Sequence, residues 1–145
     1  MSVTIAGSGV VGLEGVRFVE SALVVNTAPT TTVNMDASIS PILFYTSPMT
    51  SNVIVNLRSS STETLDSYLS TVGKVASFTL IVSNNDLAAY NISSFQIDGV
   101  NVTPSWFGGI VPQGNLSSTD MYSIFVVKTS LTPTYSIFAG QAKYL

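Results

Sequence analysis

The stretch SFQIDGVNV, residues 94–102, predicts a β-hairpin. Phe95 and Ile97 alternate with polar residues before Asp98-Gly99, and the same alternation resumes after this pair. An Asp-Gly pair between two alternating runs is a strong signal for a type I′ turn, because both turn positions need a positive φ that these residues tolerate. We therefore expect antiparallel strands in this part of the chain.

Five further runs, on both sides of this hairpin, also have the composition of strands. They are ILFYT (42–46), NVIVNLR (52–58), KVASFTLIVS (74–83), MYSIFVVK (121–128) and TYSIFAGQ (134–141). Val53, Val55 and Leu57 share one face of their run, which predicts a half-buried strand. The runs 74–83 and 121–128 are rich in β-branched and aromatic residues and more continuous than the others, as central strands are, and the last two runs are expected to form the final hairpin.

One helix is predicted over residues 60–73. Its apolar residues recur at the i, i+3, i+4 and i+7 positions of a helix face: Leu65, Tyr68, Leu69 and Val72. Ser60 and Glu63 have the spacing of a capping box, and Gly73 is placed to end the helix. We interpret Glu63 and Asp66 as carboxylates that complement the helix dipole, rather than as an acid–base pair.

The pattern as a whole predicts a mainly β protein, an antiparallel, jelly-roll-like β-sandwich with one short helix. A chain of 145 residues has room for one such domain. Residues 1–34 hold four of the ten glycines and show only short apolar bursts. We expect them to form an extended N-terminal arm or docking segment before a sandwich domain at 35–145. The alternative is that they supply the first strands of the main fold.

The composition excludes several classes of protein. Charged residues are 9% of the chain and hydrophobic residues 46%, a balance opposite to that of disordered proteins. The apolar runs are far shorter than the roughly 18 residues of a membrane span, and no secretory signal is evident. A net charge of −3 does not fit a binder of phosphate backbones. We therefore expect neither a membrane nor a nucleic acid as partner.

The reactive residues argue against catalysis. The chain has no histidine and no cysteine, which removes the Ser-His-Asp and Cys-His arrangements and the usual zinc ligands. A glycosidase needs only two carboxylates, but no spacing joins any two of Asp86, Asp98 and Asp120. We expect no catalytic residues, no metal and no cofactor.

Trp106 and Phe107 are the candidate surface residues of the second half of the chain. They follow Pro104 and precede Gly108-Gly109, so two large rings lie beside a permissive backbone. The interpretation we favour is that Trp106 caps one end of the core; the alternative is a subunit contact or a carbohydrate platform. The predicted interaction residues are these two and the apolar residues of the arm: Val3, Ile5, Val10, Val11 and Phe18.

Two stretches resemble virion structural proteins of tailed bacteriophages. The opening SVTIAGSGVVGLEGV is similar to the leaders of small tail-fibre-like proteins. The C-terminal two-thirds resembles a virion module of marine phages, with an IDG…TP.W.GG..P..G segment, a D.Y.F.I.KT strand and a Gln-x-Lys/Arg-aromatic ending. The matching residues are Asp98, Gly99, Pro104, Trp106, Gly108, Gly109, Pro112, Gly114, Asp120, Tyr122, Lys128, Thr129, Gln141 and Lys143. Phe107 and Leu145 depart from that pattern.

The resemblance implies a non-enzymatic β-rich virion component, a homo-oligomer and most simply a trimer. Its partners would be the major capsid protein or other virion proteins, and its location the virion, assembled in the bacterial host cytoplasm. We expect a capsid decoration (cement) protein, because the chain ends soon after one domain. The alternative within this class is a short tail or neck fibre, or an adaptor. A hypothesis from a different class is a module that binds a surface glycan, in which Trp106, Phe107 and Tyr122 stack on sugar rings and Asp98 or Asn101 bonds the hydroxyl groups.

Overall fold

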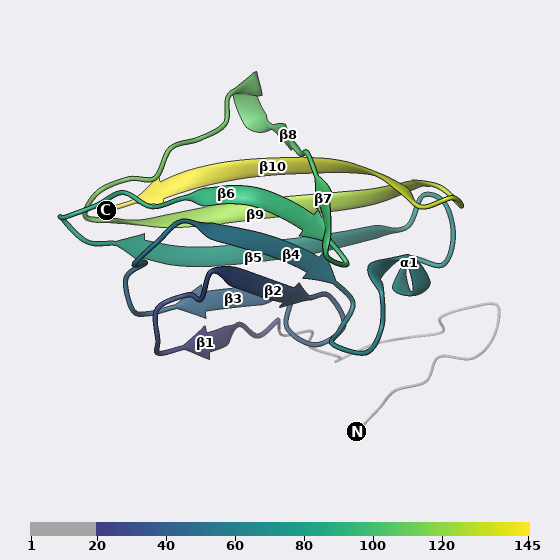
Figure 1. The fold of residues 1–145 in the computed structure, drawn as a ribbon, viewed down its shortest axis with the longest axis horizontal. Helices are drawn as coiled ribbons and strands as arrows, with labels where there is room; N and C mark the ends of the chain where they lie inside the picture. Colours follow the sequence, from purple (N-terminus) through teal and green to yellow (C-terminus); the bar gives the residue numbers. More distant parts are fainter. Residues whose placement is uncertain (1–19) are drawn as a thin grey trace, which may run out of the picture.

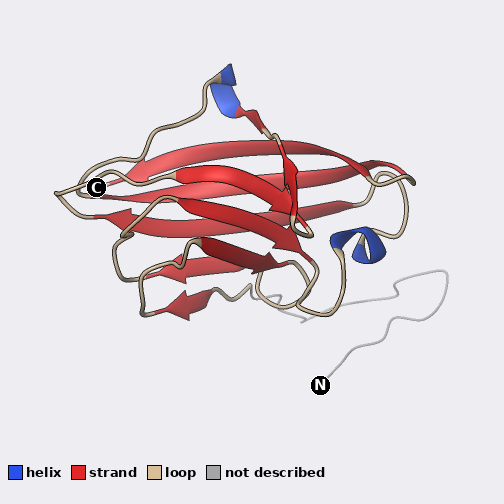
Figure 2. Ribbon diagram, in the orientation of Figure 1, coloured by secondary structure: helices blue, strands red, loops and turns tan. Residues whose placement is uncertain are grey.

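Residues 20–145 are described by the computed structural model, and most of them lie in two β-sheets (Figures 1 and 2). The six-stranded sheet has the order β1-β3-β5-β9-β10-β8 and the four-stranded sheet the order β2-β4-β6-β7. The strands are β1 (Leu23–Val25), β2 (Thr32–Asp36), β3 (Ile42–Tyr45), β4 (Val53–Arg58), β5 (Val75–Asn84), β6 (Ile92–Ile97), β7 (Val100–Val102), β8 (Ser105–Trp106), β9 (Ser118–Ser130) and β10 (Thr134–Tyr144). The helix α1 spans Leu65–Tyr68, and a 3₁₀ turn, η1, spans Phe107–Gly109.

The first six strands wind between the two sheets as a parallel β-roll. Odd-numbered strands β1, β3 and β5 pair side by side in parallel, and even-numbered strands β2, β4 and β6 do the same in the other sheet. Figure 1 shows the two sets of arrows running in opposite directions. Each turn of the roll therefore contributes one strand to each sheet.

The prediction of a mainly β chain with one short helix is confirmed, but the antiparallel, jelly-roll-like arrangement is wrong for this half. Alternation of apolar residues specifies which face of a strand is buried, and parallel and antiparallel neighbours satisfy it equally well. The connections 26–31, 46–52 and 85–91 cross from one sheet to the other. Consecutive strands therefore never pair here, and neighbours in each sheet run the same way.

Antiparallel pairing begins after β5. β9 lies between β5 and β10 and pairs with both in antiparallel register, so the predicted final hairpin is confirmed. The hairpin at Asp98-Gly99 is also confirmed, with φ of 49° and 81° at the two turn residues and β6 paired to β7. The continuous runs 74–83 and 121–128 are the central strands β5 and β9, as expected from their composition.

The inner faces of the two sheets meet in one hydrophobic core. Val53, Val55 and Leu57 of β4 are completely buried, which confirms the face predicted for that run. Phe78 and Leu80 of β5 lie in the same core from the six-stranded sheet. Alternation along each strand thus places one set of side chains inside and leaves the other set on an outer face.

The helix is much shorter than the predicted 60–73. Ser60 Oγ accepts hydrogen bonds from the backbone N–H groups of Thr62 and Glu63, which makes a tight turn where the first helical turn was expected. Serine and threonine side chains compete in this way with helical hydrogen bonding. Leu65 and Leu69 of the predicted apolar stripe are buried, whereas Tyr68 is 40% exposed and Val72 lies beyond the end of the helix.

The described part of the segment 1–34 contributes to both sheets. β1 is an edge strand of the six-stranded sheet, and β2 is an edge strand of the four-stranded sheet. Val33 is 1% exposed, and the next inward residue, Met35, is fully buried. Residues 23–34 are therefore integral to the β-roll, while 1–19 lie outside the described residues.

Candidate functional site

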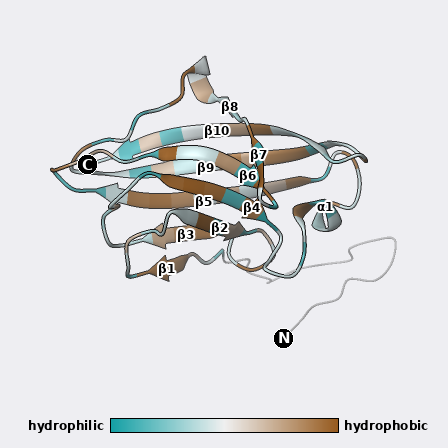
Figure 3. Cartoon of the chain, in the orientation of Figure 1, coloured by the Kyte–Doolittle hydropathy of each residue, from teal (hydrophilic) through white to brown (hydrophobic). Residues whose placement is uncertain are grey.

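The strands of the six-stranded sheet present only uncharged side chains on its outward side, and we call this side the apolar face after its rows of apolar residues. Side chains that point away from the core form a continuous row across five neighbouring strands: Val24, Phe44, Ile81, Met121 and Ala142. On the three middle strands the neighbouring residues Leu43, Leu80 and Tyr122 are buried in the core, which fixes the outward direction of this row. Figure 3 shows β3 and β5 as largely hydrophobic along their length.

Aromatic residues extend the apolar face along the central strands. Phe125 of β9 pairs with Phe138 of β10, and the two side chains are 45% and 52% exposed. Val75 and Val127 form a further outward pair beside them. No outward position on the six strands of this sheet, from Val24 to Tyr144, carries a charged residue. The row of Thr79, Ser123 and Gly140 separates Phe125 and Phe138 from the row of Ile81 and Met121. Exposed apolar residues gathered on one uncharged surface are typical of an interaction site.

A hollow of about 480 Å³ lies at one side of the apolar face. It is lined by β8, η1, β9 and β10, with Phe107, Met121, Phe138 and Gln141 among the lining residues. Phe107 is 90% exposed, and its Cβ lies beside Gly140 of β10, at 3.7 Å from where a Cβ on that glycine would be. Phe107 is thus an exposed ring beside a shallow, mostly apolar depression.

Trp106 has a different role from its neighbour. It pairs with Ala139, a buried position of β10, so its side chain faces the core side of the sheet. Its ring meets Phe95 edge-on, with centroids 5.6 Å apart, and Tyr122 edge-on at 6.5 Å. These contacts match the favoured interpretation, in which Trp106 caps one end of the core.

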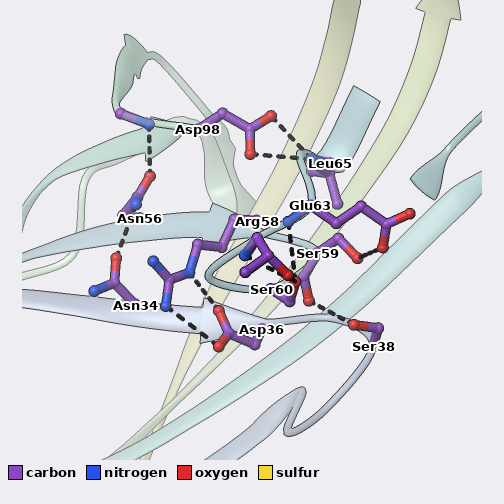
Figure 4. A network of polar contacts seen from close by, with 12 residues as sticks. Asn34, Asp36, Ser38, Asn56, Arg58, Ser59, Ser60, Glu63, Leu65 and Asp98 are labelled. Carbon is purple, nitrogen blue, oxygen red and sulfur yellow. Dashed lines mark hydrogen bonds and ion pairs between the residues drawn. The ribbon is translucent and has the colours of Figure 1, made fainter. Parts of the chain in front are cut away.

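The outward side of the four-stranded sheet is polar and contrasts with the apolar face. Amide side chains occupy one cross-strand row of it: Asn34, Asn56, Gln96 and Asn101. Asn56 donates to Asn34 over 2.8 Å and Gln96 donates to Asn101 over 3.0 Å. The next row holds the Arg58–Asp36 ion pair, at 2.5 Å (Figure 4). This side of the molecule is suited to water.

The polar network continues from this sheet to α1. Asp98, in the hairpin turn, accepts hydrogen bonds from the backbone N–H of Leu65 through both carboxylate oxygens, at 2.9 and 3.0 Å (Figure 4). Burial raises the pKa of Asp98 above its usual range, although the backbone donors oppose this effect. Ser59 Oγ donates to Glu63 over 2.5 Å. Asp98 thus joins the hairpin turn to α1. Glu63 lies before the N-cap Thr64, outside the first helical turn predicted for it, and only Asp66 occupies that turn.

A buried lysine connects α1 to the six-stranded sheet. Lys128 of β9 is 3% exposed, and its ammonium group donates to the carboxylate and the backbone oxygen of Asp66. Tyr135 of β10 has its hydroxyl buried without a hydrogen-bond partner among the described residues. Burial, together with the negative charges of Asp66 and Asp98, raises the pKa of Tyr135 to about 12. Asp66, Asp98 and Tyr135 also line a pocket of about 440 Å³ between α1, the β6–β7 hairpin and the start of β10.

Two of the carboxylates considered for glycosidase chemistry, Asp98 and Asp120, lie at opposite ends of β9. Asp120 lies at the start of β9, where it accepts from the backbone and side chain of Asn115 at 3.1 and 2.7 Å. Asp98 bonds the N-terminal end of α1, close to Asp66 and therefore to Lys128. Lys128 is eight residues from Asp120 along β9, which corresponds to about 26 Å of strand. In residues 20–145 no three metal-binding side chains cluster, and no helix is long and apolar enough to cross a bilayer.

Of the predicted interaction residues, Trp106 and Phe107 are adjacent in sequence but differ in exposure, and only Phe107 is fully accessible. Val3, Ile5, Val10, Val11 and Phe18 lie outside the described residues. The apolar face was not foreseen. The sequence signal for this face was the continuity of the runs 74–83 and 121–128. We interpreted that continuity only as a sign of central strands, although it also places apolar residues on the outward side of a strand.

Comparisons with known proteins give no match for this chain among protein families, curated proteins or solved structures.

Proposed function

We propose that this chain is a non-enzymatic virion structural protein. It forms a homo-oligomer through the apolar face, and a trimer is the state that we favour. The observation that carries the proposal is the contrast between the two outer surfaces. One is an amide-rich polar surface, and the other has a five-strand row of apolar side chains with no charge among them. Burying apolar area contributes about 25 cal/mol per Å², so contact between such faces is favourable.

Within that class we favour a capsid decoration protein, with a short tail or neck fibre, or an adaptor, as the alternative. The sequence resemblance to phage virion modules supports the class. The physical requirement is a rigid body of fixed shape, which one continuous core between two sheets meets. The major capsid protein or another virion protein would be the second partner.

The self-association part is tested with one charge on each surface. Phe125→Lys places an ammonium group on the apolar face, where desolvating it in a subunit contact is costly. Asn101→Lys places the same group on the polar surface as a matched control. Sedimentation should show an oligomer for the wild type and the control, and a monomer for Phe125→Lys. A monomeric wild type, or an unchanged Phe125→Lys oligomer, would contradict the proposal.

The position on the particle is tested by copy number. Quantitative mass spectrometry of purified particles should give hundreds of copies per particle for a capsid decoration. A few, or a few tens, would favour the fibre or adaptor. Absence from the particle would refute the virion assignment. The sedimentation experiment on self-association would still stand, because it does not depend on where the protein is found.

Glycan binding is the second candidate, favoured by the hollow beside Phe107. Exposed aromatic rings stack on sugars, and Gln141 and Ser105 line the same hollow as hydrogen-bonding groups. Because Trp106 faces the core, we expect Phe107→Ala to abolish glycan binding without changing stability. Trp106→Ala should instead lower the free energy of unfolding. The absence of any binding on a broad glycan panel would remove this candidate.

A further inference from the structure

The β6–β7 hairpin leaves a core-facing side chain uncovered. Val100 of β7 pairs with Ile97 of β6, and Val102 pairs with Phe95. Directly paired residues lie on the same face of a sheet, and Ile97 and Phe95 are buried in the core. Val100 is nevertheless 68% exposed. The core is therefore open at this end of β7.

The opening is the pocket of about 440 Å³ between the hairpin, α1 and the start of β10, and we call it the hairpin pocket. Its apolar wall includes Ile97, Val100 and Val102, and the carboxylates of Asp66 and Asp98 lie in its lining. It is more enclosed than the hollow on the apolar face. Ligand-binding pockets in proteins have this size, and they combine apolar walls with a few polar groups in the same way.

The two carboxylates of the hairpin pocket can accept further hydrogen bonds. Asp98 accepts from the backbone N–H of Leu65, at 2.9 and 3.0 Å. Asp66 accepts from Lys128 through Oδ1, and no donor among residues 20–145 reaches its Oδ2. An ionised carboxylate has about four acceptor positions, so both groups keep positions that a ligand can use.

The charges around the hairpin pocket are predominantly negative. Asp66 and Asp98 carry two negative charges against the one positive charge of Lys128. Arg58 also acts on Asp98, but it is already in an ion pair on the polar surface. Burial and the charges of both carboxylates raise the pKa of Tyr135 to about 12, so the two charges act on the same part of the lining. A cation is the ligand that complements this charge.

We propose that the hairpin pocket binds a primary ammonium group attached to an apolar body. The ammonium group pairs with the carboxylates of Asp66 and Asp98, and the apolar body covers Val100 and Val102. Free amines and lysine side chains both have this chemistry. An uncharged apolar ligand would desolvate the carboxylates without pairing them, and an anion would be repelled. The inference does not depend on the proposed function, because none of the residues that define the apolar face lines this pocket.

Three ligands of similar size and different charge test the pocket in the wild-type chain at pH 7. They are 2-phenylethylammonium, the uncharged 2-phenylethanol and the anion phenylacetate, each titrated while the methyl NMR signals of Ile97, Val100 and Val102 are followed. The ammonium ligand should shift these signals with a dissociation constant at least about tenfold below that of the alcohol, and phenylacetate should not shift them. An ammonium ligand that binds no more tightly than the alcohol, or that shifts other methyl groups instead, would overturn the proposal.

The source of the ammonium group is distinguished in the same titration with Nα-acetyl-lysine methylamide. Tighter binding of this compound than of 2-phenylethylammonium would support a lysine side chain of another protein as the natural ligand. Weaker binding would support a free amine. Both outcomes support an ammonium site.

A matched pair of variants tests the contribution of Asp98. Asp98→Asn and Asp86→Asn each remove one negative charge, and Asp86 is exposed in the connection 85–91, at the opposite end of β6. Asp98→Asn keeps an oxygen that accepts from Leu65 N–H, and it suits the same type I′ turn, so the hairpin should persist.

Asp98→Asn should weaken the binding of 2-phenylethylammonium at least about tenfold, whereas Asp86→Asn should bind as the wild type does. Unchanged binding in Asp98→Asn, or an equal loss in both variants, would overturn the proposal. If Asp98→Asn does not fold, the three-ligand comparison in the wild type decides the question without any substitution.

Discussion

At the scale of the residue, Gly114 is fixed by a backbone contact rather than by its conformation. A Cβ at this position would lie 2.1 Å from the carbonyl oxygen of Tyr90. Gly114→Ala must displace one of the two segments, and we expect it to lower the free energy of unfolding by about 1–3 kcal/mol. Gly140→Ala is the control, because its Cβ meets only the Phe107 side chain at 3.7 Å. Urea unfolding of both variants checks this; equal losses would contradict it.

Tyr135 makes stability depend on alkaline pH. Its pKa is raised from about 10 to about 12 by burial and by two nearby carboxylates. The folded state therefore keeps this proton after the unfolded chain has lost it, and stability falls as the pH rises from 10 to 12. Tyr135→Phe should flatten that fall, and near pH 7 it should leave stability unchanged or raise it by up to about 1 kcal/mol, because the hydroxyl is unpaired.

Chemical denaturation at several pH values measures this effect. Tyr144→Phe is the matched control, since that side chain is 51% exposed at the end of β10. It should leave the alkaline slope as in the wild type. A slope that Tyr135→Phe does not change would show that other groups control alkaline stability.

Single residues were also where the sequence was most informative. The burial of Val53, Val55 and Leu57 follows from alternation alone, and Asp98-Gly99 predicts its turn because few residue pairs accept two positive φ angles. The second role of Asp98, as acceptor for Leu65 N–H, could not be predicted. It depends on a contact between residues 33 positions apart, which no local pattern encodes.

At the scale of the element, α1 is held by tertiary contacts rather than by its own length. One turn of helix is not stable alone, since nucleation is unfavourable. Lys128 pairs with Asp66 on one side and Asp98 caps Leu65 on the other. The sequence placed a helix here by its apolar stripe. Its length was wrong because the serine-rich turn before it takes up backbone donors that a longer helix would use.

The Asp66–Lys128 pair gives a prediction for a double-mutant cycle. Asp66→Ala leaves a buried ammonium group with only one backbone acceptor, and should cost about 1–3 kcal/mol because Asp66 is itself 41% exposed and partly hydrated. Lys128→Met removes the charge, so the double variant should be more stable than Asp66→Ala alone. Guanidinium unfolding of the four proteins checks the cycle. Additive losses would show that the pair does not couple α1 to β9.

Strand direction was the element-scale feature that the sequence did not specify. The connections 46–52 and 85–91 carry turn residues of the kind found in hairpins and in crossings between sheets. Only the partner of each strand distinguishes the two cases, and that is a long-range choice. The two hairpins with short turns were therefore predicted, whereas the parallel β-roll was not.

At the scale of the whole molecule, the two outer surfaces differ in the interactions that they can make with a partner. The polar surface holds the amide row and the Arg58–Asp36 pair, and the apolar face holds no charged side chain. Sequence alternation reports the inner face of each strand well. It does not report that outward residues from five strands align in one row, because that alignment depends on register across the sheet.

This asymmetry predicts how self-association responds to salt. Charged contacts weaken with ionic strength, whereas apolar contacts are not screened and are strengthened by sulfate. Raising NaCl from about 0.05 to about 1 M should therefore leave the oligomer intact, and ammonium sulfate should lower its dissociation constant. Sedimentation velocity across a concentration series in each salt measures both. Dissociation in NaCl would show that charged groups form the subunit contact. In the described chain these groups lie off the apolar face, so the interface would then be on another surface.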